Sequence, residues 1–392
     1  MKIQVAVFFG GKSVEHEVSV ISAMQAIAAL DRSKYDTIPV YLPKEGGMYT
    51  GPGFDRVESY KNIPALLEGG RQVSLARQDS KVVLLSSVKK LFGTEQQATC
   101  VDVALPVLHG TFGEDGSLQG MLEIMGLPYA GCDVLSSAMC MDKASAKMAL
   151  RAADLPVLDD LVLDAYHYEQ SPETVLSALE THYPYPVIVK PANLGSSIGI
   201  SKADSREKLS AALDLAFRFS QRVIIEPALI HLREINCSVL GDSRKARASV
   251  CEEPVAQDEI LSYKDKYQSG GKSGKSEGMN SLSRVIPADL PAEKSLSVRK
   301  LAVKAFQALD CSGVVRIDFL WDTLHDVFYI NELNTIPGSL AFYLWEATDL
   351  TFPALLDELI ELAFARSRAR AQLLFTHDSN ILATADLRGS KA

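Results

Sequence analysis

The sequence contains no apolar run long enough to span a lipid bilayer, so we expect no transmembrane helix. It also lacks an excess of basic residues: 40 Lys and Arg are outnumbered by 49 Asp and Glu, and the net charge of −9 argues against general nucleic-acid binding. Cysteine is sparse. The six cysteines are scattered, without a CxxC pair or a His partner at metal-ligand spacing, so we expect reduced core thiols and a cytoplasmic protein.

Two common nucleotide-binding motifs are missing as well. No GxGxxG follows the first predicted strand, which disfavours a dinucleotide-binding oxidoreductase. The tripeptide Gly274-Lys275-Ser276 ends like a Walker A motif, but the first glycine of that motif would fall at Ser269 and no strand precedes it. We therefore reject a P-loop. What remains is a chain of 392 residues, 47% hydrophobic and 23% charged, which is typical of a globular protein of two or three domains.

The most informative stretch is VVRIDFLWDTLHDVFYINELNTIPG, residues 314–338. It predicts two β-strands joined by a polar turn near His325. Side chains alternate along a strand, so Arg316 and Asp318 share one face. A turn near His325 would place Asp318 opposite Glu332, and opposed residues point the same way.

The hairpin would therefore bring together the two carboxylates and the amide oxygen of Asn334, with a guanidinium beside them. Hard oxygen ligands without His or Cys suit Mg²⁺, which usually keeps waters and binds nucleotide phosphates as well. The alternative is a hairpin whose polar face is only solvated. Apolar residues on the other face, and the poor strand propensity of Asp, Glu and Asn, favour the metal site.

Two other segments join a buried strand to a glycine-rich loop. Residues 3–9 predict a parallel-type strand, followed by a Gly-rich turn and a helix from about 15 to 30, an arrangement that can bind an anion but that also suits a plain βα connection. Residues 101–108 predict a second such strand, followed by the loop HGTFGEDGSLQG. This loop can present the imidazole of His109 to a small substrate, although a lone His is more often structural.

A phosphate clamp is predicted at VIVKPANLGSSIG, a strand–loop–strand unit in which Lys190 ends the first strand. The lysine would neutralise phosphate charge and the loop amides and hydroxyls would cover the phosphates; a flexible hairpin is the alternative. Residues about 256–283 are rich in Ser, Gly and Lys and predict a mobile surface loop, and the tail from 376 is expected to be disordered.

Six blocks follow one another along the chain: GGKSVEHEVSVISA, HGTFGEDGSLQG, GCDVLSSAMCMDK, VIVKPANLGSSIGI, REINCSVLG, and RIDFL with NELNTIPG. In this order they resemble the D-alanine–D-alanine ligase family of the ATP-grasp superfamily, from residue 1 to about 365. The resemblance implies an α/β fold with a three-domain ATP-grasp architecture and an N-terminal parallel-sheet domain. The implied divisions are 1–133, a central ATP-grasp subdomain at 134–228, and a C-terminal subdomain at 229–375 that contains the mobile loop, with the tail at 376–392.

The resemblance also implies roles for individual residues. Phosphate contacts would come from Lys143, Lys190 and the loop Gly195, Ser196 and Ser197. Glu226 with the following hinge would bind adenine, and Glu234 the ribose. Asp318, Glu332 and Asn334 would hold two Mg²⁺ ions, for which Mn²⁺ could substitute. Glu15 would bind the ammonium of the first D-alanine with His109 nearby, Arg316 would stabilise developing charge, and Ser196 with Tyr267 would link the mobile loop to Glu15.

The implied reaction is the ATP-dependent ligation of two D-alanines through a D-alanyl phosphate, for peptidoglycan precursor synthesis, by a cytoplasmic enzyme expected to be a homodimer. Alternatives are a related ligase that uses D-lactate, D-serine or another small acceptor, and a nucleotide-binding protein that has lost catalysis. The chain departs from the family where Gly338 runs directly into Ser339-Leu340, the pair expected to hold the acceptor's carboxylate, and in the glycine- and lysine-rich run after SYKDKY.

Overall fold

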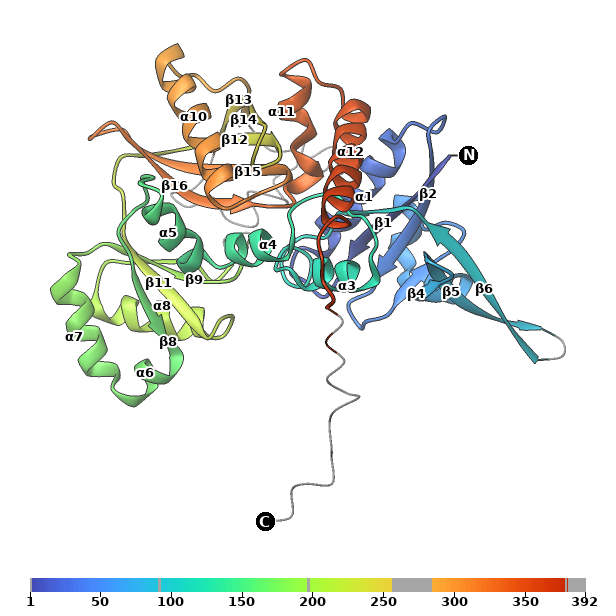
Figure 1. Cartoon of the computed structure of the whole chain (residues 1–392). Helices are drawn as coiled ribbons and strands as arrows, with labels where there is room; N and C mark the ends of the chain where they lie inside the picture. Colours follow the sequence, from blue (N-terminus) through green and yellow to red (C-terminus); the bar gives the residue numbers. More distant parts are fainter. Residues whose placement is uncertain (1, 91–92, 196–197, 256–283, 378, 380–392) are drawn as a thin grey trace.

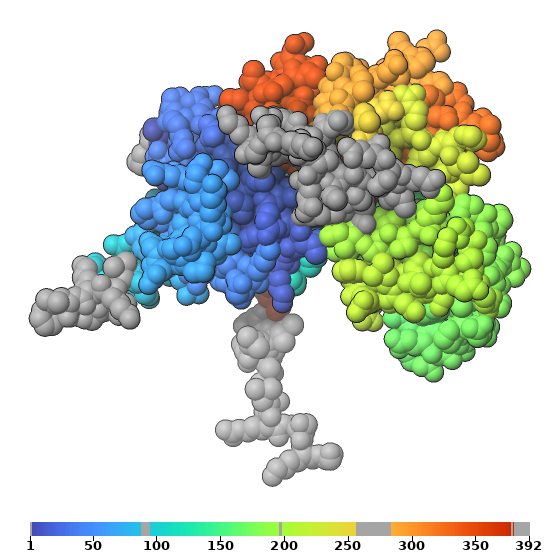
Figure 2. Space-filling view, turned by 180° about the vertical axis from the view of Figure 1, so that it is seen from behind, coloured from blue at the N-terminus to red at the C-terminus, as the bar shows by residue number. Residues whose placement is uncertain are grey.

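The computed structural model of the chain describes residues 2–90, 93–195, 198–255, 284–377 and 379. Three β-sheets follow one another along the chain, each covered by helices (Figure 1). The view from behind shows the central part of the chain, in green, projecting below the C-terminal part, in orange, with the N-terminal part, in blue, beside them (Figure 2). Among the described helices, none combines the length and the apolar composition that crossing a membrane requires.

The first sheet has the strand order β6-β5-β4-β3-β2-β1-β7. Its strands are β1 (Ile3–Gly10), β2 (Tyr35–Leu42), β3 (Met48–Thr50), β4 (Arg71–Gln78), β5 (Lys81–Lys90), β6 (Gly93–Val101) and β7 (Val103–Pro106). The apolar β1 pairs in parallel with β2 and β7, which confirms the predicted parallel-sheet domain. The insertion at about 43–100 adds antiparallel strands to this sheet, and the β5–β6 hairpin projects from it (Figure 1).

The helical segments of the N-terminal domain are α1 (His16–Ala29), η1 (Val57–Asn62), α2 (Ile63–Gly69) and α3 (Ser117–Met125). Two helices follow, α4 (Val134–Met141) and α5 (Lys143–Ala152). Asp133 and Asp142 cap these two helices through side-chain bonds to the amides of Ser136 and Ser145, so an acidic N-cap sets where each begins.

The second sheet has the order β10-β9-β11-β8 and is antiparallel throughout. Its strands are β8 (Leu161–Asp164), β9 (Val187–Pro191), β10 (Ser201–Ala203) and β11 (Arg222–Pro227). Its helices are α6 (Ala165–Gln170), α7 (Pro172–His182) and α8 (Arg206–Phe217). Its own apolar core contains Leu176, Val189, Leu213 and Val223.

The third sheet has the order β14-β13-β12-β15-β16. Its strands are β12 (Leu232–Gly241), β13 (Ala246–Pro254), β14 (Arg284–Val285), β15 (Gly313–Asp322) and β16 (Val327–Asn334). The helix α10 (Ala292–Ala308) packs on one face, where Ile317, Phe319 and Val298 share a core with Cys140 of α4 and Leu150 of α5. Because apolar residues of β15 alternate with polar ones, the other face of this sheet carries polar side chains.

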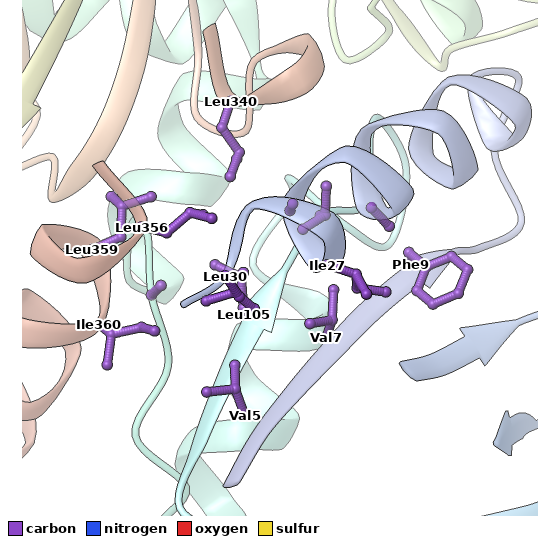
Figure 3. Close-up of a cluster of buried hydrophobic side chains, with 14 of the residues drawn as sticks. Val5, Val7, Phe9, Ile27, Leu30, Leu105, Leu340, Leu356, Leu359 and Ile360 are labelled. Carbon is purple, nitrogen blue, oxygen red and sulfur yellow. The ribbon is translucent and has the colours of Figure 1, made fainter. Parts of the chain in front are cut away.

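The chain ends with η3 (Gly338–Ala341), α11 (Phe342–Glu346) and α12 (Phe352–Arg370). The apolar side of α12 packs against the N-terminal domain rather than standing alone: Leu356 and Ile360 share one buried cluster with Val5, Leu30 and, from η3, Leu340 (Figure 3). This cluster ties the last segments of the chain to the first sheet.

Candidate active site

The predicted hairpin of β15 and β16 is confirmed, and so is its register. Asp318 lies opposite Glu332, and Arg316 lies opposite Asn334. The guanidinium of Arg316 donates to both oxygens of Asp318, with Nε–Oδ1 and Nη2–Oδ2 distances of 2.6 and 2.7 Å. The amide nitrogen of Asn334 donates to Asp318 Oδ2 at 3.0 Å. The side chains predicted to converge therefore form one hydrogen-bonded group.

The charges in this group stabilise one another. Burial alone would lower the pKa of Arg316, but the paired carboxylate of Asp318 offsets it and the pKa lies well above its ordinary value. Arg316 is therefore charged at every pH at which the protein is folded. It is a fixed positive charge beside the carboxylates, suited to a site where negative charge develops.

The oxygen donors of the hairpin fit Mg²⁺. Two carboxylates and one amide oxygen are hard ligands of the kind this ion takes, and the amide nitrogen of Asn334 already donates to Asp318, which leaves its oxygen directed elsewhere. Across the residues that the structure describes, no three His, Cys, Asp or Glu side chains are arranged to hold an ion by themselves. An ion here would complete its shell with water and with oxygens of a bound phosphate.

Lys143 and Lys190 reach this group from the other side. Lys143 begins α5, and its Nζ lies 2.7 Å from the carbonyl oxygen of Leu194 and 3.2 Å from Glu332 Oε2. Lys190 lies near the end of β9, and its Nζ lies 2.5 Å from Glu226 Oε2 and 3.1 Å from Asn331 Oδ1. Both lysines thus connect the phosphate-clamp region to the hairpin.

A cavity of about 280 Å³ lies between the second and third sheets and contains these groups. Its polar lining includes Lys143, Lys190, Lys202, Glu226, Glu234, Asp318 and Glu332. Its apolar lining includes Leu158, Ile188, Leu229, Ile230, Phe319 and Leu320. A cavity lined by apolar side chains and by cations and carboxylates suits a ligand that combines a flat ring with an anionic group.

Glu226 lies deep in this cavity wall and is bound by two lysines. Its carboxylate contacts Lys190 and the fully buried Lys147, whose Nζ also lies 3.5 Å from Asp160 Oδ1. Burial would raise the pKa of Glu226, but the ammonium groups of Lys190 and Lys147 more than offset this and hold the pKa below its ordinary value. Neither Lys147 nor Asp160 was predicted; the only local signal is the i, i+4 spacing of Lys143 and Lys147 on one helix face.

A smaller cavity, of about 30 Å³, adjoins the hairpin on the side of the N-terminal domain. Its lining includes Glu15, Glu114, Lys143, Gly195, Glu332 and Asn334. Glu15 is the residue before α1, so the predicted donor-site carboxylate and the predicted metal ligands share one cavity wall. The structure therefore brings the N-terminal domain, the clamp loop and the hairpin together at one point.

Glu114, which sequence reasoning did not single out, is the buried acid of this cavity. Its carboxyl oxygens accept from the backbone amides of Gly110, at 2.7 Å, and Ile336, at 2.8 Å. Burial, reinforced by the nearby negative charge of Glu15, raises the pKa of Glu114 to about 8. In the sequence, its signal is its position as an acid inside a glycine-rich loop. Through its bond to the Ile336 amide, Glu114 connects that loop to the turn after β16.

His109 is fully buried, and both of its ring nitrogens are used within the protein. Nδ1 donates to the carbonyl oxygen of Ile336 at 2.7 Å, and Nε2 lies 3.0 Å from the hydroxyl of Ser22. Burial lowers the pKa of His109, so the ring is neutral and Nε2 accepts from Ser22. In this structure His109 joins α1 to the turn after β16, next to the small cavity.

Ser339 and Leu340 have left-handed backbone conformations, both with φ of 53°. The amide of Ser339 donates to the hydroxyl of Ser22 at 2.9 Å, and the amide of Leu340 donates to the carbonyl oxygen of Pro337 at 2.8 Å. The side chain of Leu340 lies in the apolar cluster with Leu30 and Leu356 (Figure 3). Neither residue lines the two cavities described above.

Three predicted site residues, Ser196, Ser197 and Tyr267, lie outside the described residues. The same holds for the predicted loop at about 256–283 and for most of the tail.

Residues 4–132 match the family described as D-ala D-ala ligase N-terminus, and residues 149–361 match the D-ala D-ala ligase C-terminus. The chain belongs to the D-alanine–D-alanine ligase family. Its sequence is 41% identical over 371 residues to the D-alanine–D-alanine ligase of Thermoanaerobacter pseudethanolicus, covering 92% of this chain and 96% of that protein. It is 36% identical over 382 residues to that of Thermosipho melanesiensis, covering 97% and 98%.

Solved structures of this ligase family agree with the fold. The D-alanine–D-alanine ligase from Coxiella burnetii superimposes with a TM-score of 0.77 at 30% identity, over 95% of this chain and 96% of that one. A D-Ala:D-Ser ligase from Enterococcus faecalis gives a TM-score of 0.76 at 30% identity, over 93% of this chain and 100% of that one. The three-sheet arrangement is thus the ATP-grasp fold that the resemblance implied.

Proposed function

We propose that this chain ligates two D-alanines to D-alanyl-D-alanine, with ATP converted to ADP and phosphate through a D-alanyl phosphate intermediate, for peptidoglycan precursor synthesis. The observation that carries the proposal is the meeting of two cavities at Glu332 and Lys143. The larger cavity suits a nucleotide and the smaller one a small amino acid. A phosphoryl group at their junction would be within reach of both.

In this proposal ATP occupies the larger cavity. Its phosphates contact Lys143 and Lys190 and are covered by the loop of Gly195, Ser196 and Ser197, while its base and ribose contact the segment that follows Glu226, with Glu234 at the ribose. The apolar side chains that line this cavity support the placement of the base, because a purine ring loses water-exposed surface there.

The oxygens of Asp318, Glu332 and Asn334 would hold Mg²⁺, as two ions for which Mn²⁺ could substitute. The bound ions would neutralise charge on the transferred phosphoryl group. The fixed charge of Arg316, held against Asp318 by two hydrogen bonds, would stabilise the negative charge that develops beside them.

The first D-alanine would lie in the smaller cavity, with its ammonium at Glu15. Its carboxylate oxygen attacks the γ-phosphorus, the bond from that phosphorus to the β–γ bridging oxygen breaks, and ADP leaves. The amine of the second D-alanine, after losing a proton, attacks the acyl carbon, and phosphate leaves. Ser196 and Tyr267 would help to close the site, because water would hydrolyse the acyl phosphate.

The test uses the purified full chain with ATP, Mg²⁺ and a panel of D- and L-amino acids. We expect ADP and phosphate with D-alanine, and a product of the mass of the dipeptide. AMP and pyrophosphate as products would exclude the acyl-phosphate route.

One of the similar structures is a D-Ala:D-Ser ligase, which uses a different acceptor. Related ligation with D-serine, D-lactate or another small acceptor is therefore the second candidate. Competition between D-alanine and each alternative acceptor, followed by product mass, distinguishes them.

We further propose that the enzyme acts in the cytoplasm, as its free cysteines lead us to expect, and that it is a homodimer, as the family resemblance leads us to expect. Light scattering after size-exclusion chromatography measures the assembly directly, and a monomer at micromolar concentration would contradict the dimer.

A further inference from the structure

Three buried thiols meet behind the smaller of the two cavities. Cys140 of α4 lines that cavity, and its sulfur lies 3.7 Å from the sulfur of Cys311, in the turn between α10 and β15. The thiol of Cys132 donates to the carbonyl oxygen of Ser312, the residue after Cys311, at 3.4 Å. Neither the proposed reaction nor the predicted metal site uses any of these thiols.

Of the three thiols, Cys140 is the one that lies in a cavity wall. Cys132, Cys140 and Cys311 are 2%, 4% and 0% exposed, and neither Cys132 nor Cys311 lines either cavity. A cavity of about 30 Å³ has room for about one or two molecules of the size of water, so hydrogen peroxide fits beside the Cys140 sulfur. Among the described side chains, the three thiols are not arranged to hold a metal ion.

A disulfide between Cys140 and Cys311 requires a short movement of one side. A disulfide bond is about 2.05 Å long, so the two sulfurs must approach each other by about 1.7 Å. The turn that holds Cys311 has little freedom, because a Cβ on Gly313 would lie 2.7 Å from the Cα of Gly131 and the two backbones are already in contact there. The movement therefore falls on the end of α4, which leads directly to Lys143 at the start of α5.

We propose that Cys140 and Cys311 form a reversible disulfide when hydrogen peroxide enters the smaller cavity, and that this disulfide stops ligation. The thiolate of Cys140 attacks one peroxide oxygen: an S–O bond forms, the O–O bond breaks, and the other oxygen leaves as water after taking up a proton. The Cys311 sulfur then attacks the sulfur of the resulting sulfenic acid. An S–S bond forms, the S–O bond breaks and a second water leaves, so the two thiols lose two electrons and the peroxide gains them.

The disulfide would displace groups on both sides of the hairpin site. Lys143 follows Cys140 by three residues, and Arg316 and Asp318 follow Cys311 by five and seven residues on β15. Misplacing a reacting group by about 1 Å costs about 100-fold in rate, so we expect turnover to fall at least about tenfold. This loss of turnover rests on the proposed function, whereas the disulfide itself does not.

Access and acidity favour different thiols. The hydrogen bond with Cys311 favours the thiolate of Cys140, but burial and nearby negative charge outweigh it, so the pKa of Cys140 lies above its ordinary value. Little Cys140 thiolate is therefore present near neutral pH, and its oxidation needs millimolar peroxide. The hydrogen bond with Cys311 lowers the pKa of Cys132, but Cys132 lines neither cavity. The identity of the disulfide therefore tests whether the cavity directs the oxidation.

The test maps disulfides in the full chain that carries Cys100→Ser, a change that removes an exposed thiol which peroxide would also oxidise. This protein is treated with millimolar hydrogen peroxide, alkylated and digested without reduction. We expect a linked peptide that contains Cys140 and Cys311, and the loss of two of the five remaining thiols. Turnover with ATP and D-alanine should fall at least about tenfold as the link forms, and dithiothreitol should restore both the thiols and the turnover.

Cys237 and Cys251 are the matched control within the same molecule. They lie opposite each other on β12 and β13 and are 0% and 2% exposed in the same apolar core, but neither lines a cavity. We expect both to remain reduced. In a second protein, Cys311→Ala should prevent the link, and Cys140 should then be oxidised to a sulfinic acid that dithiothreitol does not reverse.

A peroxide-treated protein that keeps all five thiols, or that links Cys132 to Cys311 or Cys237 to Cys251, would overturn the inference. Full turnover in the linked protein would also overturn it, because the disulfide would then not stop ligation. If Cys311→Ala does not fold, the map of the parent protein decides alone. An untreated protein that forms no dipeptide would instead refute the proposed function, and the disulfide map, which uses no substrate, would keep its meaning.

Discussion

Replacing Lys147 by methionine should weaken both the stability of the protein and its affinity for ATP. Lys147 is 1% exposed and its ammonium lies between the carboxylates of Glu226 and Asp160. Methionine keeps an unbranched apolar side chain, one heavy atom shorter than that of lysine, and removes the ammonium group with its charge and its hydrogen bonds. Both neighbouring carboxylates keep another cationic partner: Glu226 keeps Lys190 at 2.5 Å, and Asp160 keeps Arg151.

The size of the effect follows from these remaining partners. Removing one member of a buried ion pair typically costs about 3–5 kcal/mol, because a charge is left without compensation. Since each carboxylate here retains a cation, we expect the low end, about 3 kcal/mol in the free energy of unfolding. Glu226 should then attract Lys190 more strongly and draw it away from a bound phosphate, which we expect to raise the KM for ATP roughly tenfold.

Urea unfolding of the full chain measures the first effect and steady-state kinetics the second. Lys208→Met is the matched control, because Lys208, in the first turn of α8, pairs at 2.7 Å with the exposed Asp204, and such an exposed pair contributes little to stability. A Lys147→Met variant that loses less than about 1 kcal/mol would show that the buried network does not depend on this lysine. An unchanged KM for ATP would show that the charge of Lys147 does not affect nucleotide binding.

Three further outcomes are expected. Glu332→Gln should fold normally yet lose nearly all turnover, because the activation barrier should rise by several kcal/mol. The control Glu346→Gln, at an exposed position, should retain turnover, and phosphate release measures both variants. Because the pKa of Glu114 is raised to about 8, the folded state binds the proton of this carboxyl more tightly than the unfolded chain does. The contribution of Glu114 to the free energy of unfolding should therefore fall as pH rises from about 4.5 to 8. The free energy of unfolding of Glu114→Gln, measured against pH, should lack this fall. With D-alanine and D-lactate competing near neutral pH, dipeptide should dominate, and Tyr267→Phe should shift the product towards the ester, because an amine acceptor depends on how it loses its proton in the closed site.

The hairpin could be predicted from the sequence because its geometry is local. Alternation along β15 and a polar turn near His325 were enough to place Asp318 opposite Glu332. The bulge next to this pair was not predicted. Pairing moves from Asp318–Glu332 to Phe319–Ile330, which leaves Asn331 as an extra residue on β16 and in contact with Lys190.

The bulge is visible in the burial pattern of β16 and not in its sequence, where residues 327–330 are four apolar residues in a row. Buried positions on β16 fall at Phe328, Ile330 and Leu333, so the spacing changes from two residues to three. With strict alternation, Ile330 and Leu333 would point to opposite faces of the sheet. One inserted residue on β16 brings both side chains into the same core. The inserted residue places the side chain of Asn331 in the lining of the larger cavity.

Contacts between segments that lie far apart in the sequence could not be predicted from local patterns. Lys147 is visible as a helix residue four positions after Lys143, but its partner Glu226 lies 79 residues further along the chain, and no local pattern links them. Likewise, the buried hydrogen bond from the Ser339 amide to Ser22 spans 317 residues. The family resemblance assigned the Ser339–Leu340 pair to the substrate, and this stays a prediction: the Ser339 amide bonds to Ser22 and the Leu340 side chain lies in the apolar core, while the Ser339 hydroxyl has no hydrogen-bond partner among the described residues.

The left-handed run at Ser339, Leu340 and Ala341 shows why such a segment escapes sequence reasoning. Three consecutive non-glycine residues with φ near 50° are unfavourable for an isolated chain, so the conformation must be imposed from outside. The burial of Leu340 against Leu30 and Leu356 and the bond from Ser339 to Ser22 supply that constraint. Because the constraint comes from α1 and α12 together, this conformation depends on contacts between the two ends of the chain, and no pattern within residues 337–341 could have predicted it.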